Sequence, residues 1–128
     1  MPAHIVISPT DPRPIYQQVV DGIKELIARG DLTEGSPLPP VRQLAADLGV
    51  NLNTIANAYR ELQKSGLILV KHGSGSVVAF KAAPGKNPED LLRALRVALT
   101  DLVLAGLSPA KITRIVLREL SHVSNPER

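Results

Sequence analysis

The sequence predicts a mainly α-helical protein with one small β-hairpin: an N-terminal winged helix-turn-helix followed by a C-terminal two-helix hairpin. Residues 39–65 are typical of two helices separated by the tight turn Gly49-Val50-Asn51. Two short apolar runs then flank Gly73-Ser74-Gly75, as in a β-hairpin. Past a linker, residues 88–128 carry leucines at helical spacing. We therefore expect a DNA-binding-type domain at 1–80, a linker at 81–87 and a helical tail at 88–128.

The first predicted helix starts near Pro14, whose missing N–H is no loss in a first helical turn. Its apolar face repeats at helical spacing and ends at Gly30; the face comprises Tyr16, Val19, Val20, Ile23, Leu26 and Ile27. Before it, His4 to Ile7 alternates apolar residues and suggests an extended arm. This helix should supply one wall of an aliphatic core, because aromatic residues make up only 2% of the chain.

The helix-turn-helix itself is predicted from residues 39–48 and 52–65. The shorter helix should bury Val41, Leu44, Ala45 and Leu48, and Gly49 should end it in a left-handed conformation. The longer helix should bury Ile55, Ala58, Tyr59 and Leu62 and end at Gly66, with either Asn51 or Asn53 as its cap. Strands at 67–70 and 76–80, joined by a turn at 71–75, complete the wing.

The tail contains two helix starts. Asn87-Pro88-Glu89-Asp90 provides a cap, a proline at the first position and two carboxylates at the positive end of the helix dipole. Gly106 ends that helix, and Ser108-Pro109 starts the next.

Two short helices cannot enclose all the aliphatic side chains of the tail, and a large exposed apolar patch usually marks an interface. We therefore expect a homodimer built from two such hairpins about a two-fold axis. The alternative is that the hairpin folds back on its own winged domain. The expected interface residues are Leu91, Leu92, Leu95, Leu99, Leu102, Val103, Ile112, Ile115 and Val116.

Composition narrows the classes of function. The chain has no cysteine, and its three histidines (His4, His72 and His122) are far apart in sequence. We therefore expect no disulfide, no metal site and no cofactor. Because the sequence shows no nucleophile–base arrangement, we also expect that the protein is not an enzyme. No apolar run is long enough for a membrane span and no secretory signal is visible, so we expect a cytoplasmic protein. A net charge of +3 permits nucleic-acid binding without requiring it.

A winged helix-turn-helix lays its second helix in the major groove of double-stranded DNA, which here makes the outward side chains of that helix the candidate base readers. Asn53 and Asn57 could bond adenine through both amide atoms. Asn53 could instead serve as a cap, Thr54 as a solvent-facing hydroxyl, and Arg42 as half of a surface salt bridge. The wing glycines could serve only the hairpin turn. The full candidate set is Arg42, Asn51, Asn53, Thr54, Asn57, Arg60, Lys64, Lys71, His72, Gly73, Ser74 and Gly75.

The sequence resembles the GntR family of bacterial transcription regulators between about Pro14 and Ala79. The matching segments include Pro14-Ile15-Tyr16-Gln17-Gln18, Ile27-Ala28-Arg29-Gly30-Asp31-Leu32, the run from Gly35 to Ala45, and Gly73-Ser74-Gly75-Ser76-Val77-Val78. The segment from Leu99 to Ser108 is similar to the end of the short tail of the YtrA-type subfamily. That resemblance implies a dimerising tail and a repressor, commonly of operons for ATP-driven membrane transporters.

Three departures from the family pattern remove polar groups from the reading surface. Pro40 stands where a capping Ser or Thr is usual, Leu52 where Arg is frequent, and Ala56 where a basic residue is common. We therefore expect an unusual sequence preference, weighted toward A·T pairs through Asn57, and modest affinity at physiological salt. The sparse charge also supports an alternative, a winged helix used for protein–protein contact. A small-molecule effector could bind between wing and tail, although no residue indicates one.

Overall fold

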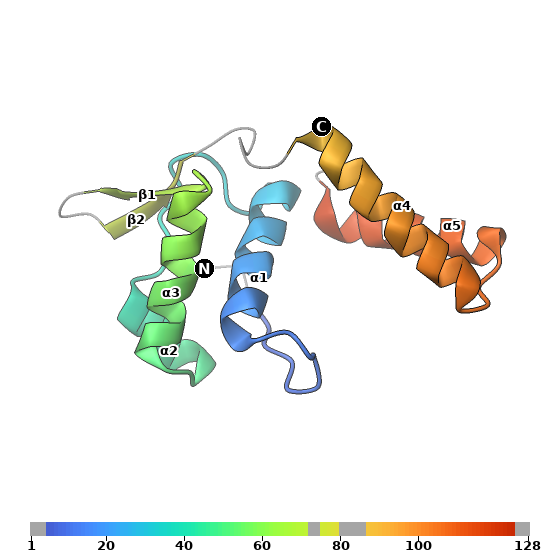
Figure 1. Cartoon of the computed structure of the whole chain (residues 1–128). Coiled ribbons are helices and arrows are strands. Elements are labelled where there is room, and N and C mark those ends of the chain that lie inside the picture. Colours follow the sequence, from blue (N-terminus) through green and yellow to red (C-terminus); the bar gives the residue numbers. More distant parts are fainter. Residues whose placement is uncertain (1–4, 72–74, 80–86, 125–128) are drawn as a thin grey trace. The chain divides into compact units, whose positions relative to one another are not determined.

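Five α-helices and one antiparallel β-hairpin make up the described part of the chain, residues 5–71, 75–79 and 87–124 of a computed structural model. The order is α1 (Ile15–Arg29), α2 (Val41–Leu48), α3 (Leu52–Lys64), β1 (Ile68–Lys71), β2 (Gly75–Val78), α4 (Pro88–Leu104) and α5 (Pro109–Val123) (Figure 1). The predicted fold class is confirmed. Contacts divide the chain into two compact units, residues 1–84 and 85–128. Most of the predicted linker lies outside the described residues, so the exact domain limits stay a prediction.

Helix α1 (Ile15–Arg29) ends at Gly30, as the sequence predicts; Gly30 is a left-handed C-cap with φ 86°. Val19, Val20, Ile23 and Leu26 are buried against α3, which lies beside α1 (Figure 1). The prediction that Tyr16 belongs to the apolar face was wrong, because its side chain is 41% exposed. At this end of α1 the buried position belongs to Gln18 instead.

Gln18 fastens the segment before α1 to the helix. Its Oε1 accepts from the Ser8 N–H at 2.9 Å, and its Nε2 donates to the Ser8 carbonyl at 3.2 Å. Ile5 and Ile7 pack on the core while Val6 between them is exposed, in keeping with the predicted alternation. The arm passes close to α1, where a Cβ built on Gly22 would lie 3.2 Å from Ile5 Cγ2. His4 lies outside the described residues.

Helix α2 begins at Val41, two residues later than predicted. Pro40 restricts the backbone of Pro39 to extended conformations, and Pro40 itself is extended (ψ 149°). No side chain caps the helix, as expected for a proline at that position. Gly49 ends α2 with φ 68°, in the predicted left-handed conformation, and leads directly into α3.

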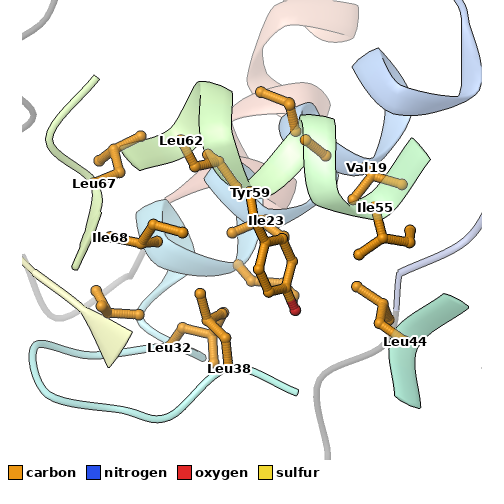
Figure 2. Close-up of a cluster of buried hydrophobic side chains, with 14 of the residues drawn as sticks. Val19, Ile23, Leu32, Leu38, Leu44, Ile55, Tyr59, Leu62, Leu67 and Ile68 are labelled. Carbon is orange, nitrogen blue, oxygen red and sulfur yellow. The ribbon is translucent and has the colours of Figure 1, made fainter. Parts of the chain in front are cut away.

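The buried face of α3 is the predicted one: Ile55, Ala58, Tyr59 and Leu62. Figure 2 shows Ile55, Tyr59 and Leu62 in one cluster with Val19 and Ile23 of α1, Leu38 of the loop before α2, and Leu44 of α2. The Tyr59 hydroxyl donates a hydrogen bond of 2.6 Å to the carbonyl of Pro39. This bond ties the middle of α3 to the residues that precede α2.

The wing is a two-stranded antiparallel sheet in which Ile68 pairs with Val78 and Lys71 with Gly75. Ile68 and Val78 are both buried, so this end of the hairpin belongs to the core. Strand β2 is also bonded to the loop before α2, through Leu38 N–H to the Ser76 carbonyl (2.9 Å) and Gly35 N–H to the Val78 carbonyl (2.8 Å). The strands deviate from the predicted limits by one or two residues, and Phe80 lies outside the described part.

The tail helices start as predicted. Asn87 Oδ1 accepts from the Glu89 N–H at 2.9 Å, and Ser108 Oγ accepts from the Lys111 N–H at 3.2 Å. Gly106, with φ 99°, follows the end of α4. Of the two helices, α4 has no buried residue and α5 has only Ile112.

Candidate nucleic-acid interface

The N-terminal end of α3 is shaped by a side-chain cap. Asn51 Oδ1 accepts a hydrogen bond of 2.7 Å from the Asn53 N–H, so Asn51 and not Asn53 is the cap that the sequence left undecided. This bond satisfies one of the amides that a helix start leaves without a partner. Asn51 therefore has a structural role, and the exposed side chain of Asn53 is not needed for capping.

Four predicted contact residues share the outward face of α3. Asn53, Asn57, Arg60 and Lys64 are all exposed, and they follow one another at intervals of four, three and four residues. That spacing places them in one line along a helix. The buried residues Ile55, Ala58, Tyr59 and Leu62 lie on the other side. Thr54 is half-buried at the border between the two faces.

Asn57 and Arg60 form a pair that the sequence analysis missed. Arg60 Nη1 donates to Asn57 Oδ1 at 2.7 Å. An amide bonds adenine with both its acceptor and its donor, and Asn57 Oδ1 has a second lone pair besides the one that Arg60 uses, so adenine readout by Asn57 stays a prediction. Its Nδ2 keeps its two N–H donors. The three-residue spacing on one helix was the available signal for this pair.

Arg42 is exposed on α2, in the helix expected to cross the DNA backbone. No carboxylate lies within salt-bridge distance of it in the described part of the chain. The surface salt bridge considered as its alternative role is therefore not found there. Its guanidinium is available for a phosphate, which it can bond through two parallel N–H groups.

The structure describes only part of the wing tip. His72, Gly73 and Ser74 lie outside the described residues, as does the side chain of Lys71. Gly75 has φ 74°, and a Cβ built on it would have no atom within 4 Å. The left-handed backbone alone accounts for a glycine at this position. Whether these residues touch DNA stays a prediction.

The largest group of exposed aliphatic side chains lies on the tail. Leu91, Leu92, Leu95 and Val103, all predicted at a dimer interface, are exposed, and Leu99, Leu102, Ile115 and Val116 are half-buried. Ile112 departs from that prediction: only 6% of it is exposed, because it packs inside the single hairpin. The sequence analysis missed further exposed aliphatic side chains, which are Val97, Leu104, Leu117, Leu120 and Val123.

An apolar groove of about 360 Å³ runs between the two tail helices. Its lining comes from α4, from Pro109 and from α5; the residues are Leu99, Val103, Pro109, Ile112, Thr113, Val116 and Leu117. Three of the predicted interface residues that are not buried, Leu99, Val103 and Val116, line it.

Two other kinds of feature are absent from the part of the chain that the structure describes. In residues 5–71, 75–79 and 87–124 there is no group of three or more His, Asp or Glu side chains that could hold a metal ion. None of the helices in these ranges combines the length and the apolar composition that a bilayer crossing requires.

The helix-turn-helix and wing match a known family. The sequence profile described as "Bacterial regulatory proteins, gntR family" matches residues 15–78, which is half of the chain. The chain belongs to the GntR family. The match starts at the first residue of α1 and ends at the last residue of β2, so it covers every element of the winged domain.

Among curated GntR relatives, the chain is 38% identical over 78 residues to the HTH-type transcriptional repressor YtrA of Bacillus subtilis (strain 168). This match covers 61% of the chain and 60% of that relative, which is less than two thirds of its length. A solved structure of YtrA from Sulfolobus acidocaldarius is also similar, with a TM-score of 0.64 and 36% identity over 76% of this chain and 97% of the other. Both matches support the YtrA-type subfamily that the resemblance predicted.

Two further solved structures extend the comparison. The crystal structure of a transcriptional antiterminator from Listeria monocytogenes EGD-e has a TM-score of 0.83 at 29% identity, covering 96% of this chain and 95% of the other. The similarity therefore includes the tail. The DNA-binding domain of AraR, solved in complex with operator ORX1, has a TM-score of 0.52 at 29% identity over 58% of this chain and 92% of the other.

Proposed function

We propose that this GntR-family regulator is a homodimeric repressor that binds an inverted-repeat operator with α3 in the major groove. The observation that carries the proposal is the division of α3 into a fully buried face and an exposed line of Asn53, Asn57, Arg60 and Lys64. The similar DNA-binding domain of AraR was solved in complex with operator ORX1, which supports DNA as the partner of this face. Arg42 on α2 supplies a phosphate contact.

The dimer is supported by the tail. A hairpin in which only Ile112 is buried cannot be stable on the strength of its own packing, because helices in proteins owe most of their stability to tertiary contacts. A second copy offers the same apolar surface and covers it symmetrically. Two α3 helices related by a two-fold axis favour half-sites about one helical turn of DNA apart.

The rival function is protein–protein contact through the winged domain. It is favoured by the apolar residues Leu52 and Ala56 at the start of α3 and by the low net charge of +3. Both functions are compatible with the fold, so the partner must be determined by binding.

The test is selection of duplexes from a random-sequence DNA pool by the full-length protein, followed by mobility shifts with the enriched duplex. Arg42→Ala should weaken binding and lower the slope of log K against log salt by about 0.9 for each phosphate that the guanidinium neutralises. Asn57→Ala should weaken binding and relax the preference at one position of each half-site. Lys24→Ala removes an exposed charge on α1, away from the motif, and is the matched control for Arg42.

No enrichment of any duplex would refute DNA binding and favour the protein–protein contact. Enrichment of a duplex whose binding is indifferent to both Arg42→Ala and Asn57→Ala would refute the assignment of the interface. The regulation of transporter operons, a small-molecule effector and a cytoplasmic location remain predictions from the resemblance and the sequence.

A further inference from the structure

Helix α3 begins with an exposed aliphatic side chain. Leu52 is the first residue after the Asn51 cap and is 40% exposed. Ala56, half-buried, follows four residues later and so lies directly beside it on the helix surface. The first two turns of α3 therefore carry an apolar strip formed by Leu52 and Ala56, which offers no hydrogen-bonding group.

A strip of amides runs next to this apolar strip. Asn53 lies three residues before Ala56, at the spacing of helix neighbours, and Asn57 lies four residues after Asn53; both are exposed. Arg60 Nη1 donates to Asn57 Oδ1 at 2.7 Å, which uses one of the two lone pairs of that oxygen and leaves both Nδ2 N–H donors available. The two strips together offer apolar surface beside hydrogen-bond donors.

Thymine is the base whose major-groove edge matches this combination. It presents a C5 methyl group next to the O4 acceptor, whereas adenine has no methyl group at this edge. Guanine presents two acceptors and no methyl, so placing it against Leu52 would desolvate a polar atom without a partner. Coverage of a methyl group by the apolar strip therefore favours thymine over both purines.

We propose that Leu52 and Ala56 select thymine in each operator half-site by covering its methyl group, while Asn57 donates to its O4. This inference rests on the proposed function, since it assumes that α3 enters the major groove. It replaces the expected adenine readout by Asn57 with recognition of the other base of the same pair.

The test removes only the methyl group. In the duplex enriched from the random pool, each thymine is replaced in turn by uracil, which keeps O4 and the base pair. Wild-type binding should weaken about fourfold for each contacted methyl at one or two positions per half-site, from the transfer free energy of one such group. Leu52→Ala should bind the thymine duplex more weakly and show little further loss with uracil.

Two variants control for indirect effects. Leu52→Met keeps an apolar side chain of similar size and should keep the sensitivity to uracil. Ile15→Ala truncates an equally exposed aliphatic side chain (43%) at the start of α1 and should leave both affinity and sensitivity unchanged.

The possible outcomes distinguish a failure of this inference from a failure of the proposed function. A bound duplex in which no uracil replacement weakens wild-type binding overturns thymine selection and leaves DNA binding intact. A uracil effect of equal size in wild type and Leu52→Ala overturns the role of Leu52. Failure to enrich any duplex overturns the proposed function, and this inference with it.

Discussion

At the scale of single residues, some polar side chains at the start of α3 stabilise the helix, and others are candidates for recognition. The Asn51 side chain accepts a hydrogen bond from the backbone N–H of Asn53, and Asn57 Oδ1 accepts one from the Arg60 guanidinium. In the function that we propose, each bond restrains a side chain that would otherwise lose rotational freedom when DNA binds. The cost of ordering these groups is therefore partly met during folding.

The cap role of Asn51 can be separated from any contact with DNA. Asn51→Ala should lower the free energy of unfolding by about 1 kcal/mol, because the Asn53 amide loses its acceptor. Asn51→Ser keeps an acceptor at the cap and should leave stability within a few tenths of a kcal/mol of wild type. Urea denaturation followed by circular dichroism measures both. If Asn51→Ser keeps stability but loses DNA affinity, Asn51 contacts DNA in addition to capping the helix.

At the scale of elements, α3 is positioned from three sides. Its apolar face packs on α1, its middle is bonded to Pro39 through Tyr59, and its C-terminal end continues into β1. The loop before α2 is in turn bonded to β2, so the recognition helix, the wing and α2 share one network of contacts. In the function that we propose, a rigid arrangement of this kind keeps the base-reading side chains in register with the phosphate-binding ones.

The hydrogen bond between Tyr59 and Pro39 can be tested alone. Tyr59→Phe keeps the ring in the core and removes the donor, so it should lower the free energy of unfolding by about 0.5–1.5 kcal/mol. Tyr16→Phe, at the exposed tyrosine of α1, is the matched control and should have no effect on urea denaturation. Equal stability of both variants and the wild type would show that the Pro39 carbonyl finds another donor.

Burial raises the pKa of Tyr59 well above its ordinary value of 10.0. The hydroxyl therefore remains a donor at every physiological pH. A raised pKa in the folded state means that this stability is complete below about pH 10 and is lost as the pH rises through the folded value. The difference in stability between wild type and Tyr59→Phe should accordingly be constant between pH 6 and about pH 9.

At the scale of the whole molecule, the sequence was most informative where the structure depends on local periodicity. The buried positions of α3, the left-handed Gly49 and the caps Asn87 and Ser108 all follow from neighbouring residues. The Asn57–Arg60 pair was missed because it depends on side-chain conformations, which spacing permits but does not fix. Tyr16 was misplaced because the rim of a helix face is decided by what packs against it.

The tail shows the same limit at a larger scale. Helical spacing identifies its apolar residues, but spacing cannot tell which of them the hairpin covers by itself. Ile112 turns inward, while Leu95 is 48% exposed and Leu104 is 79% exposed. A second copy is the cover that we propose for Leu95 and its face of α4, so Ile112 and Leu95 have different roles. Ile112 stabilises each hairpin, and Leu95 joins two hairpins.

This division gives a prediction for the whole molecule. Leu95→Asp should convert the full-length dimer into a monomer in light scattering, because a carboxylate would be buried without a partner at the interface. Leu104 follows Leu95 by nine residues, or two and a half helical turns, and so lies on the opposite face of α4. Leu104→Asp is therefore the matched control and should remain dimeric. The Leu95→Asp monomer should keep its winged domain folded by circular dichroism and bind an inverted-repeat duplex much more weakly, because the two half-sites are no longer linked. A Leu95→Asp protein that is still dimeric, or a wild-type protein that is monomeric, would show that the apolar surface of the tail is covered in some other way.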